Sequence, residues 1–272
     1  MITDLLRQRF GGAWRVQALG ASEFCDTWQA DGNGERLFVK TGGLALEAEA
    51  DGLQALGGHI RAPVVRGCWR AGGPTVLALE WLELSPARDG RAFGLALASL
   101  HAAPAGERFG WHRDNFLGST LQRNRWCDSW VGFHASERLG ALAAQLPALG
   151  AAVQRVIDVL PRFFDDGHEP RASLIHGDLW SGNWAALLSG APVVYDPAVS
   201  VSDPEAELAM LELFGSPPDA FWGAYREVMP IAAGYARRRP LFQLYNMLNH
   251  ALLFGGGYVG QARTMAEGLA GR

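Results

Sequence analysis

The sequence predicts an α+β protein of two lobes, a small N-terminal lobe of antiparallel strands with one helix and a larger, mostly helical C-terminal lobe. Two observations predict it. Residues 14–79 alternate short apolar runs with turn signals around one helical segment, and most of the later sequence follows a helical period. We expect residues 1–80 to form the small lobe, 81–86 a hinge and 87–272 the large lobe of one domain.

The small lobe is expected to follow the order strand, strand, strand, helix, strand, strand after a short first helix. Asp31-Gly32-Asn33-Gly34 is a strong hairpin signal between the second and third strands. The expected elements are a helix at 2–10, strands at 14–19, 24–29 and 37–40, a helix at 44–56 and strands at 64–69 and 75–79. In the large lobe we expect helices at 90–102, 124–146, 148–165, 205–214, 217–228 and 240–254.

Composition excludes several function classes. A net charge of −4 and a pI near 6.0 argue against a general nucleic-acid binder, which would carry a basic stripe. The one basic run, Arg237-Arg238-Arg239, is expected on a solvated helix face or loop.

The cysteines and the apolar runs indicate the cellular compartment of the protein. The three cysteines are scattered and lack metal-type spacing, which favours reduced thiols in the cytosol over a disulfide framework. No apolar stretch is long enough to span a bilayer, and the N-terminus lacks a signal-peptide core. We therefore expect a soluble, cytoplasmic protein without membrane partners.

One motif predicts the chemistry. Asp178 follows an apolar strand and His176-Gly177, Asn183 comes five residues later, and Asp196 ends the next apolar run. A carboxylate on a loop can accept a hydroxyl proton, while an amide oxygen and a second carboxylate can hold Mg²⁺ on nucleotide phosphates. This layout is that of phosphoryl transfer in the protein-kinase-like fold. Taken singly, each residue could instead be a turn or strand-end residue.

A lysine in the small lobe completes the expected phosphate site. Lys40 ends an apolar strand, where a lysine of this fold contacts the α- and β-phosphates. The helix that follows carries two candidate partners for its ammonium group, Glu49 and Glu47, and we prefer Glu49. The turn Gly20-Ala21-Ser22 is the candidate cover over the nucleotide, although it has only one glycine.

Three further residues near these motifs allow two interpretations each. His176 is expected to support the loop rather than transfer protons, because Asp178 already fills the role of the base. Trp180 either belongs to the core or stacks on an apolar sugar face. Cys25 is expected to be a semi-buried strand cysteine rather than a redox-active thiol.

A glycine-rich string near the C-terminus resembles a dinucleotide-binding motif. Gly255-Gly256-Gly257-Tyr258-Val259-Gly260 fits the pattern G-x-G-x-x-G, but it follows a helical period and not a strand. We interpret it as a helix C-cap and tight turn.

Taken together, these motifs resemble those of the fructosamine kinases, also called ketosamine-3-kinases, which are relatives of aminoglycoside and choline phosphotransferases. Trp180-Ser181-Gly182-Asn183 and the pairing of Phe109-Gly110-Trp111 with Asp114-Asn115-Phe116 point to this family in particular. The segments that carry the resemblance are 38–40, 47–53, 100–101, 109–111, 114–120 with Gln122 and Asn124, 176–183, 195–198, 207–210 with Phe214-Gly215, and 244–258.

The resemblance implies a role for each motif. It implies ATP and Mg²⁺ as cofactors and a ketosamine, a sugar attached to an amine by glycation, as the acceptor whose 3-hydroxyl is phosphorylated. The phosphorylated adduct then breaks down and frees the amine. The implied roles are Asp178 as catalytic base, Lys40 with Glu49 as the phosphate-positioning pair, Asn183 and Asp196 as Mg²⁺ ligands, Glu80, Trp81 and Leu82 as the adenine-binding hinge, and Trp180, Asp114 and Asn115 at the substrate.

One segment departs from the family pattern. The family usually has Tyr-Gly-x-Arg-Glu-x-Asp before Leu-Ala-Met, whereas Val201, Ser202, Pro204 and Glu207 stand at four of these positions here. Two other functions therefore stay open, a kinase for another small hydroxyl compound such as an aminoglycoside or amino alcohol, and a non-catalytic nucleotide-binding module.

Overall fold

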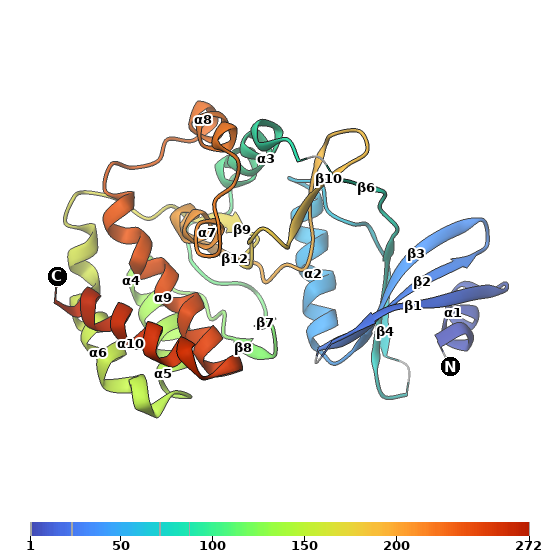
Figure 1. Ribbon diagram of the computed structural model, residues 1–272, viewed down its shortest axis with the longest axis horizontal. Coiled ribbons are helices and arrows are strands. Elements are labelled where there is room, and N and C mark those ends of the chain that lie inside the picture. The colour runs from blue at the N-terminus through green and yellow to red at the C-terminus, as the bar shows by residue number, and fades with distance from the viewer. Residues whose placement is uncertain (1, 23, 71, 87, 272) are drawn as a thin grey trace.

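The computed structural model describes residues 2–22, 24–70, 72–86 and 88–271, so residue 87, the first of the expected large lobe, lies outside it. Figure 1 shows a strand-rich N-terminal part beside a mostly helical remainder, which confirms the α+β kinase-like fold. Within the described residues, no helix is both long and apolar enough to cross a lipid bilayer.

The N-terminal part is built on a five-stranded antiparallel sheet in the order β1-β2-β3-β5-β4. Asn33 and Gly34 form the turn between β2 and β3 with φ angles of 52° and 77°, so the expected hairpin is confirmed. The strands are β1 (Trp14–Ala21), β2 (Cys25–Gly32), β3 (Glu35–Gly42), β4 (Val65–Arg70) and β5 (Thr75–Glu80).

Alternation along the strands gives the sheet two apolar faces. Val76 and Ala78 of β5 pack with α1 (Ile2–Phe10), whereas Leu77 and Leu79 pack with α2 (Ala45–Gly57). The cluster on the α2 side continues into α3 (Gly90–Ala102) and beyond. The sheet and the helical part therefore share one core at their junction.

Four short strand pairings and a series of helices form the rest of the chain. The strands are β6 (Leu84–Ser85), β7 (Asn115–Leu117), β8 (Thr120–Gln122), β9 (Ser173–Ile175), β10 (Trp184–Leu187), β11 (Pro192–Val194) and β12 (Ser200–Ser202). They pair as β11-β10-β6, β12-β9 and β7-β8. The helices are α4 (Trp130–Phe133), α5 (Ala141–Ala143), α6 (Pro147–Val159), α7 (Pro204–Leu211), α8 (Asp219–Val228), α9 (Tyr235–Phe254) and α10 (Gly257–Ala270).

The single helix expected over residues 124–146 is wrong. Residues before Ser129 are extended, because Cys127 pairs with the backbone of Phe109. Ser129 then caps α4 by accepting a hydrogen bond from the amide of Gly132. A π-helical turn at His134–Gly140 follows before α5, so tertiary pairing overrides the helical period here.

The expected C-cap after residue 254 is confirmed, but the turn does not extend through residue 260. Gly255 and Gly256 have φ angles of 60° and 55°, and the amide of Gly255 bonds the carbonyl of Ala251. A further helix, α10, then starts at Gly257. It packs against α9 and α6 (Figure 1).

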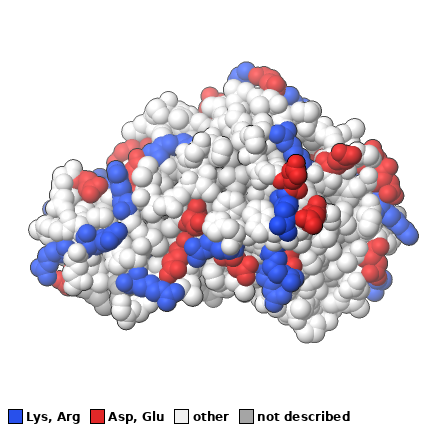
Figure 2. All heavy atoms as spheres, turned by 180° about the vertical axis from the view of Figure 1, so that it is seen from behind, with Lys and Arg blue, Asp and Glu red and all other residues white. Residues whose placement is uncertain are grey.

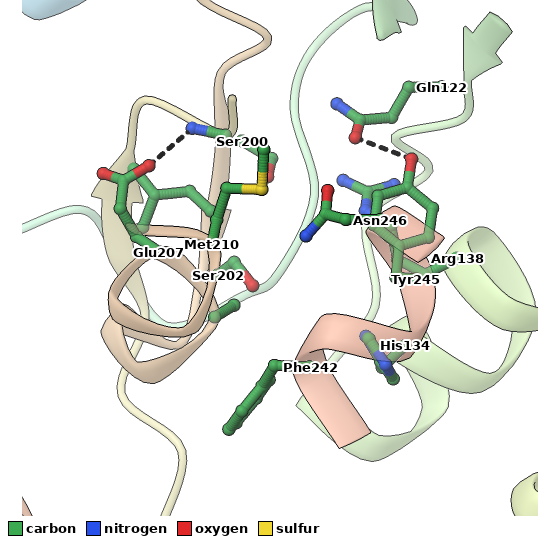
Figure 3. A pocket seen from close by; sticks show the side chains of 13 residues that line it. Gln122, His134, Arg138, Ser200, Ser202, Glu207, Met210, Phe242, Tyr245 and Asn246 are labelled. Atoms are coloured by element: carbon green, nitrogen blue, oxygen red, sulfur yellow. Dashed lines mark hydrogen bonds between the residues drawn. The ribbon is translucent and has the colours of Figure 1, made fainter. Parts of the chain in front are cut away.

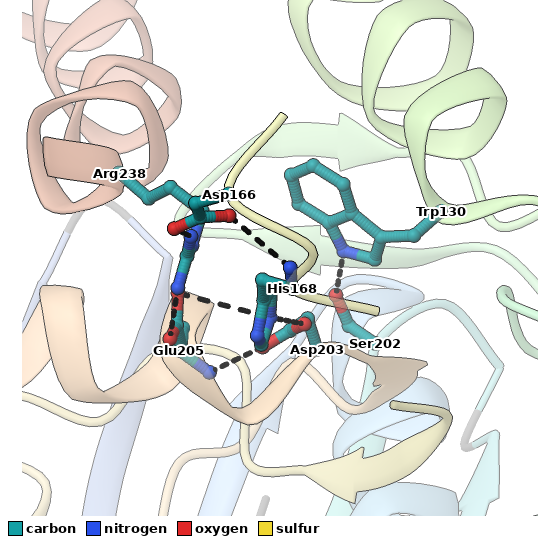
Figure 4. Close-up of polar contacts among 7 residues, drawn as sticks. All are labelled: Trp130, Asp166, His168, Ser202, Asp203, Glu205 and Arg238. Atoms are coloured by element: carbon teal, nitrogen blue, oxygen red, sulfur yellow. Dashed lines mark hydrogen bonds and ion pairs between the residues drawn. The ribbon is translucent and has the colours of Figure 1, made fainter. Parts of the chain in front are cut away.

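The expectation that the basic run is solvated is wrong for Arg238. Its side chain is fully buried and holds Glu205 through two hydrogen bonds of 2.7 and 2.9 Å, with Asp166 as a further partner. Figure 4 shows this cluster beside His168, whose Nε2 lies 2.8 Å from Asp203. The buried charge ties α9 to the first turn of α7.

At the surface, acidic and basic side chains are interspersed (Figure 2). On the face shown in Figure 2, basic and acidic side chains among the described residues lie next to one another over a largely uncharged surface. The side chain of Arg239, next to Arg238 in the chain, is partly exposed and pairs with Glu212 at 2.8 Å.

We predict that Arg238→Met lowers the free energy of unfolding by about 3–5 kcal/mol, because it leaves Glu205 buried without its cation. The matched Arg239→Met variant, one position along the same helix, should cost about 1 kcal/mol or less. Urea unfolding of the two variants measures the difference. Equal losses would contradict the role given to the buried arginine.

Candidate active site

The loop at residues 176–183 joins β9 to β10 and carries the residues singled out by the sequence. Each strand is paired, β9 with β12 and β10 with β11, so both ends of the loop are fixed. Gly177 adopts a φ angle of 84°, and a Cβ atom there would lie 2.0 Å from the Ala198 carbonyl oxygen. Only glycine permits this approach of two backbones.

Glu207 of α7 is hydrogen-bonded to the backbone of the loop. Its carboxylate accepts hydrogen bonds from the amides of His176 and Gly177 at 2.9 and 2.7 Å, and lies 3.1 Å from His101 Nε2. His101 in turn contacts the hydroxyl of Tyr225 at 2.8 Å. Burial alone would raise the pKa of Glu207, but the interactions with His101 and His176 lower it. The sequence placed Glu207 in a segment of family resemblance and at a departure from the family pattern, but it indicated no role for the residue.

His176 supports the loop, as its geometry suggests. Its ring is fully buried, and burial lowers its pKa, so the imidazole is neutral. Nε2–H donates to the carbonyl of Tyr195 at 2.9 Å, and Nδ1 accepts from the amide of Asp178 at 3.3 Å. Both ring nitrogens are used to join the loop to the segment before Asp196.

Asp178 and Asn183 lie side by side. The amide nitrogen of Asn183 donates to the Asp178 carbonyl at 2.8 Å and to its carboxylate at 3.1 Å. Burial, with the negative charge of Asp196 nearby, raises the pKa of Asp178 to about 7. A carboxylate held in this way is suited to accept a proton near neutral pH.

Lys40 joins the sheet, α2 and the segment after β11. Its ammonium lies 2.7 Å from Glu49 and 2.5 Å from Asp196, and the side chain is 7% exposed. Burial alone would lower the pKa of Lys40, but the two carboxylates more than offset it and raise the pKa. The rival partner, Glu47, instead pairs with Arg70 at 2.8 Å.

Asn183 and Asp196 form a donor set that suits Mg²⁺. Asp196 has a φ angle of 59°, which is rare outside glycine and typical of functional sites. The nitrogen of Asn183 is engaged by Asp178, so its amide oxygen is the atom available to a cation. One amide oxygen and one half-exposed carboxylate are hard ligands of the kind that Mg²⁺ binds beside phosphates.

A cavity of about 500 Å³ lies between the sheet and the connector after β5. Ser22, Lys40, Glu80, Trp81 and Leu82 all line it, whereas Gly20 and Ala21 are not among its lining residues. The carboxylate of Glu80 is held by Arg61 and the amide of Val64, so it is structural. Cys25 also lines the cavity, and burial raises the pKa of its thiol, which disfavours the reactive thiolate.

A second cavity, of about 360 Å³, lies on the other side of Asp178. Trp180 lines it with a side chain that is 39% exposed, so this tryptophan is not a core residue. A third cavity, lined by Lys40, Asp178 and Asn183, lies between the two. Asp178 therefore borders both the space near Lys40 and the outer cavity.

The sequence-based interpretation missed most of the wall of the outer cavity. Phe214, Asn246, Asn249, His250 and Phe254 contribute to it from α9 and the segment after α7. These residues do not belong to any short sequence motif for catalysis or binding. The helical pattern alone assigns most of them to ordinary helix faces. Four of them lie within the C-terminal segment of family resemblance, and Phe214 belongs to the separate piece Phe214-Gly215, but the resemblance gave none of them a role.

Asp114 and Asn115 are used within the protein. Asp114 accepts a hydrogen bond from the amide of Asn124 at 2.9 Å and is absent from the lining of these three cavities. Asn115 lines the third cavity, but its side chain is buried, donates to the carbonyl of Val199 and accepts from Gln122. These contacts brace the β7-β8 hairpin at the edge of the site.

Comparison with known proteins decides the family. The sequence model of the fructosamine kinase family matches residues 2–270. This chain belongs to the fructosamine kinase family. It is 41% identical over 231 residues to a probable ketoamine kinase of Synechocystis, covering 82% of this chain and 77% of the relative. It is 36% identical over 246 residues to the chloroplastic protein-ribulosamine 3-kinase of Oryza sativa subsp. japonica, covering 85% and 71%.

Solved structures agree. The crystal structure of a predicted fructosamine-3-kinase from Thermobifida fusca superposes with a TM-score of 0.86 at 32% identity, covering 100% of this chain and 99% of that one. The choline kinase LicA of Streptococcus pneumoniae has a TM-score of 0.64 at 14% identity, covering 100% and 98%. The second likeness shows the shared fold alone, and the family is that of phosphotransferases with an alcohol acceptor.

We predict that Gly177→Ala lowers phosphotransfer at least about 100-fold, because the added methyl group displaces the loop that carries Asp178. Gly190→Ala is the matched control, since Gly190 has a φ angle of 85° and nothing within 4 Å of a Cβ atom. It should cost about 1–2 kcal/mol of stability and leave the rate unchanged. If the two variants lost activity equally, backbone strain and not loop position would explain the effect.

Proposed function

We propose that this protein is an ATP- and Mg²⁺-dependent kinase that phosphorylates the 3-hydroxyl of ketosamines. The observation that carries the proposal is the position of Asp178, which borders both the cavity shared with Lys40 and Asn183 and the outer cavity. A carboxylate at such a junction can receive a proton from a hydroxyl that faces a phosphate on the other side.

The chain's own residues supply positioning and proton transfer. Lys40, oriented by Glu49, binds the nucleotide phosphates, and Asn183 and Asp196 would hold the metal. When bound, Mg·ATP supplies the phosphoryl group and offsets the charge on its oxygens. Asp178 orients the acceptor hydroxyl and takes its proton as the new oxygen–phosphorus bond forms and the bond to ADP breaks.

Family membership supports the acceptor class. The relatives are named for ketoamines and ribulosamine, and we extend that class to this chain. Trp180 supports it further, because an exposed indole ring beside the base offers a flat face to a sugar. Breakdown of the 3-phosphate then frees the amine, which makes the reaction a repair of glycation.

The test is an assay of the purified protein with Mg·ATP and the fructosyl and ribulosyl adducts of lysine. We predict phosphate transfer to at least one adduct, a loss of about 100- to 10,000-fold in Asp178→Asn, and full activity in the exposed control Asp165→Asn. Chelating Mg²⁺ should abolish transfer, and adding it back should restore it.

The same assay includes hygromycin B and choline as acceptors, because proteins of the same fold are an aminoglycoside phosphotransferase crystallised with hygromycin B and a choline kinase. Transfer to either of these, with ketosamines at background, would contradict the proposed acceptor class. Binding of Mg·ATP without transfer to any acceptor would contradict catalysis itself.

A further inference from the structure

Exposed aromatic rings gather around the outer cavity. Among the described residues, five aromatic side chains are exposed, and four of them line this one cavity. They are Phe24, Trp180, Phe214 and Phe254, with exposed fractions of 40%, 39%, 43% and 56%. Exposed apolar surface concentrated in one hollow, and not scattered, typically marks a place where a ligand binds.

Two of these rings, Phe214 and Phe254, form a wall together with His250 and Tyr258. His250 lies 4.9 Å from Phe214, 5.6 Å from Phe254 and 5.3 Å from Tyr258, measured between ring centroids. Its Nδ1 lies 2.8 Å from the carbonyl of Asn246 one turn earlier in α9, which fixes the ring at the centre of the group. The wall thus combines α9, α10 and the segment after α7 in one rigid surface.

The charges of the cavity restrict what it can bind. Asp178 is the only acidic residue among the described residues that line it, and no lysine or arginine joins it there. Aromatic faces attract cations, and a single carboxylate adds to this attraction. A ligand with a protonated secondary amine and an apolar group suits such a wall. A ligand with a carboxylate near its amine does not, because no lysine or arginine among the described residues lines the cavity to pair with that carboxylate.

The polar end of the cavity suits the sugar. The amides of Asn246 and Asn249 line the same space, and each has an oxygen that no described residue bonds. Both side chains are at least nine-tenths buried. Figure 3, a view into a neighbouring cavity, shows Asn246 projecting from α9 beside Met210, and both residues also line the outer cavity. Two amide oxygens without a partner among the described residues therefore belong to residues in the wall of the cavity that Asp178 also lines.

We propose that the substituent on the acceptor's amine lies against Phe214, Phe254 and Tyr258, so that the enzyme selects ketosamines whose amine carries an aromatic or long aliphatic group. The inference rests on the proposed function and adds the part of the substrate that does not react. Covering such a group with rings removes apolar surface from water on both sides. The lysine side chain, with its aliphatic stem, belongs to the accepted class.

The experiment compares two fructosyl adducts that differ only in the amine substituent, those of benzylamine and methylamine. We expect the wild type to phosphorylate the benzyl adduct with a kcat/KM at least about 10-fold higher, mostly through a lower KM. Phe254→Ala should reduce this preference to about 3-fold or less, because it lowers kcat/KM for the benzyl adduct more than for the methyl adduct. Trp126→Ala, the exposed aromatic residue outside the cavity, is the matched control and should change neither value.

Equal kcat/KM values for the two adducts in the wild type would overturn the inference and leave the proposed function intact. So would an equal loss on both adducts in Phe254→Ala. If neither adduct is phosphorylated, the proposed function fails, and tryptophan fluorescence with AMP-PNP present then measures binding of the two adducts directly. Tighter binding of the benzyl adduct that Phe254→Ala abolishes would support the inference, and its absence would refute it.

Discussion

The ammonium of Lys40, buried between Glu49 and Asp196, is the interaction on which the rest of the site depends. A lysine taken out of water is costly unless its charge is matched, and here two carboxylates from different parts of the chain match it. Because β3, α2 and the segment after β11 each supply one of the three groups, the contact fixes these elements relative to one another. The expected phosphate and metal positions are thereby set close together by the protein itself.

A second set of buried contacts fixes the loop that carries Asp178. Glu207, which stands where the family pattern has Asp, accepts hydrogen bonds from the amides of His176 and Gly177. The rest of the altered segment is also used, because Ser202 accepts a hydrogen bond from Trp130 and Pro204 starts α7 after the cap Asp203. The departures therefore fall on residues that hold the loop and α7.

The sequence was most informative where structure depends on near neighbours. The hairpin at Asn33-Gly34 and the helix at 90–102 follow from local rules, and the pairing of Lys40 with Glu49 spans only nine residues. The sequence was not informative where residues far apart in the chain determine whether a side chain is buried. Nothing near Arg238 in the chain indicates burial, since its partners Glu205 and Asp166 lie 33 and 72 residues away.

The candidate site also contains residues that the sequence predicted and residues that only the fold brings together. The loop residues and Lys40 were found because their spacing reflects the chemistry, whereas the aromatic wall is assembled by the packing of α9 and α10, and α10 was not expected at all. The family resemblance includes Phe214 and Phe254 but gives them no role, so only the fold shows that they line the same cavity as Asp178.

The central claim is that Lys40 is positioned by Glu49 and not by its neighbour Glu47. Isothermal titration calorimetry with Mg·AMP-PNP tests it, comparing Glu49→Gln with Glu47→Gln in the same helix. We predict that Glu49→Gln weakens binding at least about 10-fold, since one charge partner of a buried ammonium is lost, while Glu47→Gln stays within about 2-fold of wild type. Equal affinity in the two variants, or a larger loss in Glu47→Gln, would contradict this account.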